Sequence, residues 1–285
     1  MRMPTTPGAG RAGFTALLAL AAGILLTFLA LPLVALFTQA PLGEIPHLLS
    51  EPVLQEILVV TLKTNAFANL LIIGLGTPTA YLLATRRFPG RALLVTLVEL
   101  PLVLPPAVAG IGLLAAFSAG GLLGTPLQEA GISIPFTQWA VVLAITFVAS
   151  PFYVRQAIAA FEAVDPRLAD ASRTLGVGPA LTFWRVSLPL AAGGLVAGWV
   201  LAFARGIGEF GATIMFAGNV RGVTQTLTLG IYEQLDSNFD LSLAIGVLLV
   251  ILSAAVLLAY KMISSWRTSI STSTSLFRPS QSLQR

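Results

Sequence analysis

Residues 161–189 read FEAVDPRLADASRTLGVGPALTFWRVSLP and connect two long apolar runs. The first part of this stretch is patterned as a short helix. Asp165 is a good N-cap, Pro166 suits the first helical position, and Gly176 supplies a stop that Gly178 and Pro179 reinforce. About ten residues lie between cap and stop, roughly 15 Å of helix. The stretch therefore predicts a short, capped helix on a polar connection between two apolar runs.

Spacing places Leu168, Ser172 and Leu175 on one face of this helix, with Arg167, Asp170 and Arg173 supplying charge. Such a helix can lie on lipid headgroups or dock into a partner protein. Two leucines give weak membrane attachment, which favours docking. The residues alone leave both interpretations open.

The composition around the stretch predicts a membrane protein. Hydrophobic residues make up 56% of the 285 and charged residues 10%, whereas a soluble domain is about 25% charged. Apolar runs long enough to span a bilayer, without the period-two alternation of strands, predict an all-α fold with six transmembrane helices. The runs are Phe14–Phe37, Ile57–Ala84, Ala92–Ser118, Trp139–Ala160, Val186–Ala204 and Leu241–Ile263.

The basic residues predict the orientation of these spans. If both termini are cytoplasmic, every Lys and Arg except Lys63, Arg205 and Arg221 falls on the cytoplasmic side. Membrane orientation, rather than nucleic-acid binding, thus accounts for the net charge of +4. The first apolar run exceeds the roughly 7–15 residues of a signal-peptide core, so we expect a retained span. Residues 264–285, rich in Ser and Thr, are expected to form a disordered cytoplasmic tail.

The connecting stretch resembles the "EAA" loop of ABC importer permeases. That pattern is Glu-Ala-Ala, three residues, Gly and a distant hydrophobic-Leu-Pro. Glu162-Ala163 matches, Val164 replaces the second Ala, the gap to Gly176 is longer than in the compact pattern, and Leu188-Pro189 closes the loop. The resemblance implies a type I ABC importer permease fold, with one permease domain over residues 1–263 and a cytoplasmic coupling helix in the loop 161–189. It assigns contact with the ATPase to Glu162, Ala163, Asp165, Leu168, Ala171, Arg173 and Gly176.

The resemblance also implies the partners and the location. These are a second copy of the chain, a cytoplasmic ABC ATPase dimer, an extracytoplasmic oxyanion-binding protein and the lipid of a bacterial inner membrane. The chain has two lysines, Lys63 and Lys261, and neither follows a Gly-rich stretch, so it contains no P-loop. We therefore expect a transport subunit rather than an enzyme, with no cofactor of its own and with ATP and Mg on the separate ATPase.

A second resemblance concerns the transported species. The block from Gly208 to Thr213, Asn219, the run 224–227 and the run 100–110 closely resemble molybdate permeases over roughly residues 55–260. Sulfate and tungstate permeases share much of the pattern. The resemblance therefore implies import of a tetrahedral oxyanion, with molybdate preferred.

Polar and proline residues within the spans are candidates for a translocation pathway or gate. Arg205 and Glu209 are four residues apart and can pair, either at a gate or as a neutral structural pair near the outer interface. Polar groups of the second span can bind an oxyanion or hold helices together. The prolines of the third span must distort it, because each removes a backbone hydrogen-bond donor. The sequence does not reveal a partner for Glu99 in the same span. The candidates are Thr61, Thr64, Asn65, Pro105, Pro106, Arg205, Glu209 and Phe210.

Other functions are weighed against that of an importer permease. Gly206, Gly208 and Gly211 spell G-x-G-x-x-G, but no strand precedes them, so close helix packing or a bend is the better interpretation. The absence of cysteine and the single His47 argue against a metal site. The sequence contains neither an intramembrane Asp pair nor a Gly-x-Ser-x-Gly nucleophile motif, so it gives no sign of a membrane enzyme. An ion-driven carrier or channel remains the alternative of a different class.

Overall fold

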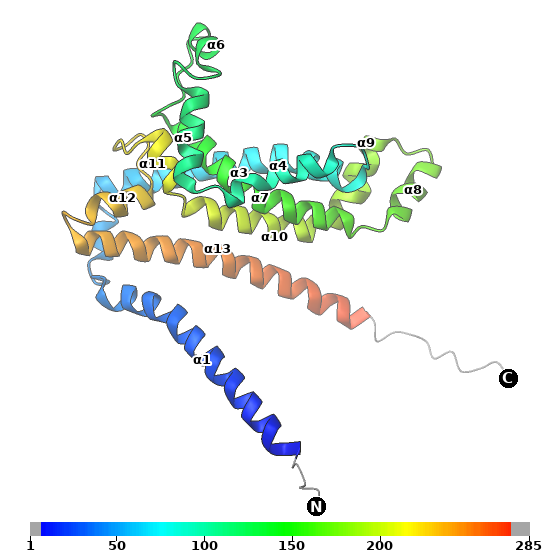
Figure 1. Ribbon diagram of the computed structural model, residues 1–285, viewed down its shortest axis with the longest axis horizontal. Coiled ribbons are helices and arrows are strands. Elements are labelled where there is room, and N and C mark those ends of the chain that lie inside the picture. The colour runs from blue at the N-terminus through cyan, green and yellow to red at the C-terminus, as the bar shows by residue number, and fades with distance from the viewer. Residues whose placement is uncertain (1–6, 275–285) are drawn as a thin grey trace, which may run out of the picture.

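The computed structural model describes the backbone of residues 7–274 and the side chains of residues 13–262. Every regular element in that range is helical, as expected for an all-α fold (Figure 1). The helices are α1 (Pro7–Gln39), α2 (Ile45–Leu48), α3 (Pro52–Thr85), α4 (Arg91–Val103), α5 (Pro106–Phe117), α6 (Gly124–Glu129), α7 (Gln138–Glu162), α8 (Pro166–Thr174), α9 (Pro179–Thr182), the π-helix η1 (Phe183–Ser187), α10 (Leu188–Ile207), α11 (Gly211–Ala217), α12 (Leu227–Gln234) and α13 (Phe239–Thr274).

Five stretches are long and apolar enough to cross a membrane: Gly13–Gln39, Pro52–Thr85, Gln138–Glu162, Pro179–Ile207 and Phe239–Met262. A sixth is present if α4 and α5 together form one span, although their axes meet at 116°. The described chain is thus an all-helical membrane protein with five to six apolar helices, and each expected run coincides with one of them.

Helices α3, α7 and α10 lie side by side and form the centre of the molecule (Figure 1). Small residues make this packing close. A Cβ added at Gly76 on α3 would lie 2.8 Å from the ring of Tyr153 on α7, and one at Gly206 on α10 would lie 2.8 Å from Ile145. The Tyr153 hydroxyl also hydrogen-bonds Thr77 at 2.6 Å. Without a hydrophobic driving force between helices in lipid, such backbone approach and interhelical hydrogen bonds hold spans together.

The prolines break the third span, as predicted. Helix α4 ends at Val103, and Leu104 and Pro105 are extended, with ψ near 130°. A residue before proline is disfavoured in the helical region, and Pro106 then starts α5 at a position where no backbone donor is needed. Pro101 stays inside α4. As a result α5 leaves the layer of the other helices and carries α6 away from it (Figure 1).

Helix α1 diverges from the rest of the molecule and contacts it through α13 (Figure 1). None of the hydrophobic window in Gly13–Gln39 is buried within the chain. Such a surface requires lipid or another protein around it. At the other end, α13 continues to Thr274, and residues 275–285 of the expected disordered tail lie outside the described residues.

Candidate functional site

Local chemistry builds α8 as the sequence predicts. The Asp165 carboxylate accepts a hydrogen bond from the backbone N–H of Arg167 at 2.9 Å, and Pro166 is the first helical residue. Beyond the last turn, Gly176 adopts a φ of +80°, the left-handed conformation in which a side chain is strained. Cap, first turn and stop therefore all lie where they were expected.

Helix α8 projects at one end of the molecule, beyond the ends of the long helices (Figure 1). Its leucines face outward: Leu168 is 47% exposed and Leu175 is 83% exposed. Ser172, expected on the same face, is instead buried, because its hydroxyl pairs with that of Thr182 at 3.1 Å. All seven residues that the resemblance assigns to ATPase contact are exposed in this chain.

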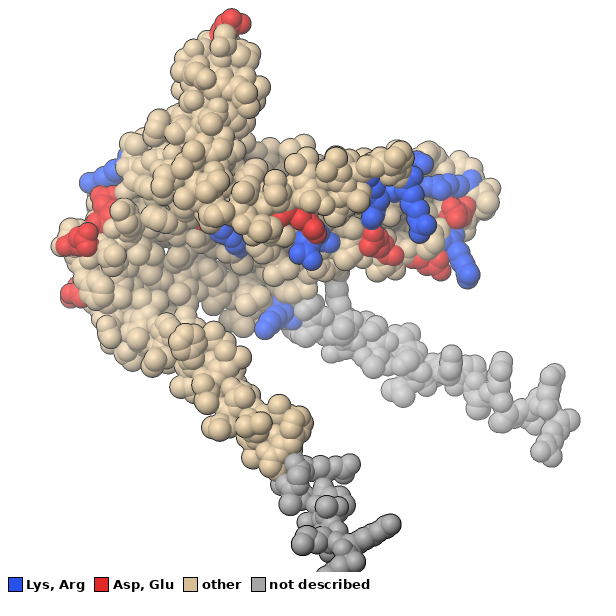
Figure 2. Space-filling model, viewed as in Figure 1, with Lys and Arg blue, Asp and Glu red and all other residues tan. Residues whose placement is uncertain are grey.

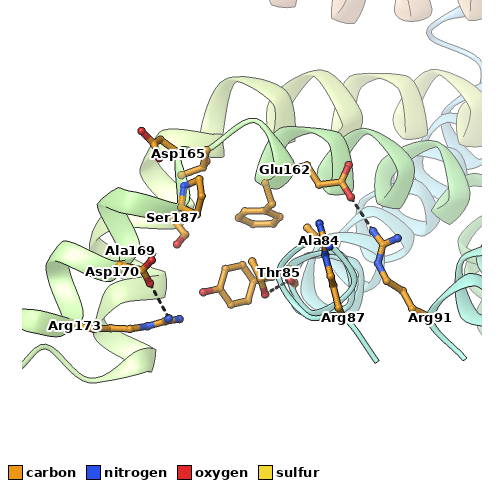
Figure 3. Close-up of a pocket in the computed structure, with 14 residues that line it drawn as sticks. Ala84, Thr85, Arg87, Arg91, Glu162, Asp165, Ala169, Asp170, Arg173 and Ser187 are labelled. Atoms are coloured by element: carbon orange, nitrogen blue, oxygen red, sulfur yellow. Dashed lines mark hydrogen bonds and ion pairs between the residues drawn. The ribbon is translucent and has the colours of Figure 1, made fainter. Parts of the chain in front are cut away.

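A cavity of about 780 Å³ lies behind α8, between this helix and the adjacent ends of α3 and α7 (Figure 3). Two of its arginines pair with acidic residues. Arg91 pairs with Glu162 at 2.8 Å, and Arg173 pairs with Asp170 at 3.2 Å. Lys and Arg gather at this end of the molecule (Figure 2), which is the charge pattern expected of a cytoplasmic side.

The three pathway candidates of α3, Thr61, Thr64 and Asn65, are buried. Thr61 and Thr64 each donate to a carbonyl one turn back at 2.7 Å, and Thr61 also accepts from the N–H of Leu227 at 2.9 Å. Asn65 accepts from the Asn69 amide at 3.0 Å, and its own Nδ2 has no hydrogen-bond partner among the described residues. Of these contacts, the one between Thr61 and Leu227 joins two helices, α3 and α12, and the others lie within α3. A role in the pathway stays a prediction.

Arg205 and Glu209 form the predicted pair, at 2.7 Å, where the chain breaks between α10 and α11. The Glu209 side chain is 1% exposed, and its second oxygen accepts from the N–H of Ala212 at 2.8 Å. The hydroxyl of Thr228 donates to the Glu209 carbonyl at 2.8 Å. The ring of Phe210 packs on Tyr232, with centroids 5.3 Å apart. Glu209 thus fixes both the end of α10 and the start of α11.

The structure brings the broken spans together at this point. A Cβ added at Gly211 on α11 would lie 2.8 Å from Pro106, and one at Gly110 on α5 would lie 2.6 Å from the carbonyl oxygen of Ala212. Gly206, Gly208 and Gly211 were expected to allow close helix packing or a bend, and close packing is confirmed for Gly206 and Gly211. The start of α5 and the break between α10 and α11 therefore lie together, at the opposite end of the bundle from α8 (Figure 1). Five predicted gate residues belong to these two segments: Pro105, Pro106, Arg205, Glu209 and Phe210.

Sequence reasoning missed the ion pairs that hold α4 to α7. Arg91 meets Glu162, and Glu99 meets Arg155 at 3.1 Å. A signal was present, because opposite charges lie about two turns apart on each helix. In the part of the chain that the structure describes, no cluster of three or more His, Asp or Glu residues could hold a metal ion.

Comparisons with known proteins agree with this architecture. Residues 73–268 match the family "Binding-protein-dependent transport system inner membrane component". The chain is 45% identical over 235 residues to "Molybdenum transport system permease protein ModB" of Mycobacterium bovis, covering 82% of this chain and 88% of that protein. The Escherichia coli protein of the same name is 39% identical over 225 residues, covering 79% and 97%. "Sulfate transport system permease protein CysT" of Escherichia coli is 35% identical over 253 residues, covering 88% and 91%.

A solved structure shares the fold. It is a bacterial ABC transporter involved in the import of the acidic polysaccharide alginate, with a TM-score of 0.72 at 15% identity, covering 90% of this chain and 96% of that one. The family match covers well over half of the chain, and the curated relatives align along most of their own length. The chain therefore belongs to the family of binding-protein-dependent transport system inner membrane components, the permease subunits of ABC importers.

Proposed function

We propose that this chain is the permease that carries molybdate into the cytoplasm, driven by ATP hydrolysis on a separate subunit. The observation that carries the proposal is the 45% identity to a molybdenum permease over 82% of the chain. The exposed, capped α8 supports it from the side of the structure, because it offers two leucines and several charges to a partner.

The proposed topology has six spans, with α4 and α5 counted as one broken span and both termini in the cytoplasm. The concentration of Lys and Arg at the α8 end supports this orientation (Figure 2). In it, α8 is the coupling helix and projects into the cytoplasm. The Arg205–Glu209 pair then lies toward the outer face of the membrane.

The proposed assembly contains two copies of this chain, two ABC ATPase subunits and an external oxyanion-binding protein. The exposed surface of α1 supports contact with a second copy, and a fold relative is solved as a bacterial alginate ABC transporter in complex with an alginate pentasaccharide-bound periplasmic protein. The ATPase subunits hold ATP and Mg. Their closure moves α8 and reorients the spans, and hydrolysis resets them.

Sulfate and tungstate are the alternatives within the class, since a sulfate permease is 35% identical over 88% of the chain. The external binding protein sets much of the choice, so a test needs the whole complex. We would reconstitute the permease, its ATPase and its binding protein in liposomes and measure uptake of radiolabelled molybdate. We expect uptake that requires ATP and is reduced by unlabelled molybdate at lower concentration than by sulfate.

Two results would count against the proposal. Sulfate competing as well as molybdate would move the substrate assignment to sulfate. Uptake by this chain alone, driven by an ion gradient without ATP, would replace the ABC mechanism by that of a secondary transporter.

A further inference from the structure

Arg91 ties together three helices at the α8 end of the molecule. It is the first residue of α4, its Nε donates to the carbonyl oxygen of Leu83 near the end of α3 at 2.6 Å, and its Nη2 pairs with Glu162 at 2.8 Å. Glu162 is the last residue of α7, four residues before α8 begins. Figure 3 shows the pair bridging from the start of α4 to this corner. One side chain therefore links α3 and α4 to the point where the chain turns toward α8.

A second ion pair repeats the link along the same two helices. Glu99 on α4 meets Arg155 on α7 at 3.1 Å. The two charges of each helix are about two turns apart, so they lie on one face of that helix. Because the helices are antiparallel, each charge faces an opposite charge on the other helix. Helix α4 has no buried residue of its own. Val98 of α4 packs against the core that α7 helps to form, and the two ion pairs add fixed contacts between α4 and α7.

From α4 the connection continues to the opposite end of the bundle. Helix α4 passes into α5 through Leu104 and Pro105, and α5 packs closely on α11. A methyl group added at Gly110 would lie 2.6 Å from the carbonyl oxygen of Ala212, whose N–H is held by Glu209. A rigid contact therefore runs from α5 to the break that Glu209 organises.

We propose that Arg91 is a positioning residue for transport: it fastens α4 to the α7–α8 corner, so that movement of α8 reaches α11 through α4 and α5. This inference rests on the proposed function, in which an ATPase moves α8. It also assigns Glu162 a partner within the chain, in addition to the ATPase contact that the resemblance implies. In this proposal, α4 and α7 move together as one unit near α8, and α5 and α11 move together as a second unit at the opposite end of the bundle.

The first test uses the reconstituted complex of permease, ATPase and binding protein, and measures molybdate uptake per ATP hydrolysed. Arg91→Gln should keep ATP hydrolysis but lower this ratio at least about fivefold, the lower end of usual coupling effects. Arg87→Gln is the matched control. Arg87 lines the same cavity, and among the described residues its side chain forms no ion pair.

Arg91→Lys keeps a positive charge beside Glu162 and leaves Glu162 itself intact for the ATPase, so it should retain more of the ratio than Arg91→Gln. Two outcomes would overturn the inference: Arg91→Gln behaving like Arg87→Gln, or Arg91→Lys staying as low as Arg91→Gln. Both leave the proposed function standing, whereas wild-type uptake without ATP would refute that function instead.

A second test asks whether α4 and α7 move as one body. The chain has no cysteine, so Glu99→Cys with Arg155→Cys creates a unique pair that a short bismaleimide can join. The cross-linked complex should keep the uptake of the same double variant before cross-linking. If cross-linking abolishes uptake, α4 must slide on α7 during transport, and the proposed rigid link is wrong.

Discussion

Gly110→Ala should loosen the contact between α5 and α11 and lower both stability and transport. The new Cβ would lie 2.6 Å from the Ala212 carbonyl oxygen, 2.7 Å from the Met215 Cβ and 2.9 Å from the Ala212 Cα, well inside the 3.4 Å at which ordinary contact begins. Two of these atoms are backbone, so a rotamer change cannot relieve the overlap. Overpacking of this kind costs about 1–3 kcal/mol.

Gly112→Ala on the same helix is the matched control. No atom lies within 4 Å of the position where its Cβ would stand, and the residue is exposed. Replacing glycine by alanine inside a helix gains up to about 1 kcal/mol. The same added methyl group should therefore destabilise at position 110 and stabilise at position 112.

The assay is thermal unfolding of the purified permease in nanodiscs, together with molybdate uptake by the reconstituted complex. We expect a lower unfolding midpoint and reduced uptake for Gly110→Ala, and an unchanged or higher midpoint for Gly112→Ala. Equal midpoints for the two variants would refute the close approach of α5 and α11, and with it the argument that this contact carries movement.

Three further changes test other parts of the site. Gly176→Arg places a side chain at a φ of +80°, so the variant should insert in the membrane but lose binding-protein-stimulated ATP hydrolysis; normal stimulation would contradict a docking role for α8. Asp165→Ala removes the cap of α8 and should cost about 1 kcal/mol locally, seen as faster amide exchange in α8, whereas unchanged exchange would mean that the cap contributes nothing. Glu209→Ala leaves Arg205 without its partner and the N–H of Ala212 without its acceptor, which should cost about 3 kcal/mol of stability. Glu209→Gln keeps an oxygen that can accept from Ala212 and should cost less. Equal unfolding midpoints for these two variants would show that the hydrogen bond to Ala212 contributes nothing.

Much of the helical order follows from local chemistry. The apolar runs define the spans because lipid accepts a helix only if about 20 successive residues are apolar. Pro105 and Pro106 break the third span because the two residues remove backbone donors, and Asp165, Pro166 and Gly176 delimit α8 through their own backbone preferences. The Arg205–Glu209 pair is four residues apart and could be anticipated from helical spacing alone.

Side-chain contacts between helices far apart in the chain could not be predicted from local sequence patterns. The sequence presents Glu99 and Arg155 as two charges on different spans, and the alignment of α4 along α7 makes them partners at 3.1 Å. Likewise, the sequence did not reveal that the Thr61 hydroxyl meets the N–H of Leu227 at 2.9 Å, a contact between α3 and α12. Ser172 shares a helical face with two leucines, but Thr182 covers it.

The sequence by itself determined the membrane class, the positions of the apolar helices, the broken third span and the short capped α8, since each depends on residues close together in the chain. The tertiary structure decided which side chains meet: Arg91 with Glu162, and Gly110 with the backbone of Ala212. The physical reason is that these meetings depend on how helices tilt and slide against one another. Packing among many side chains sets that geometry, and no single segment of the sequence encodes it.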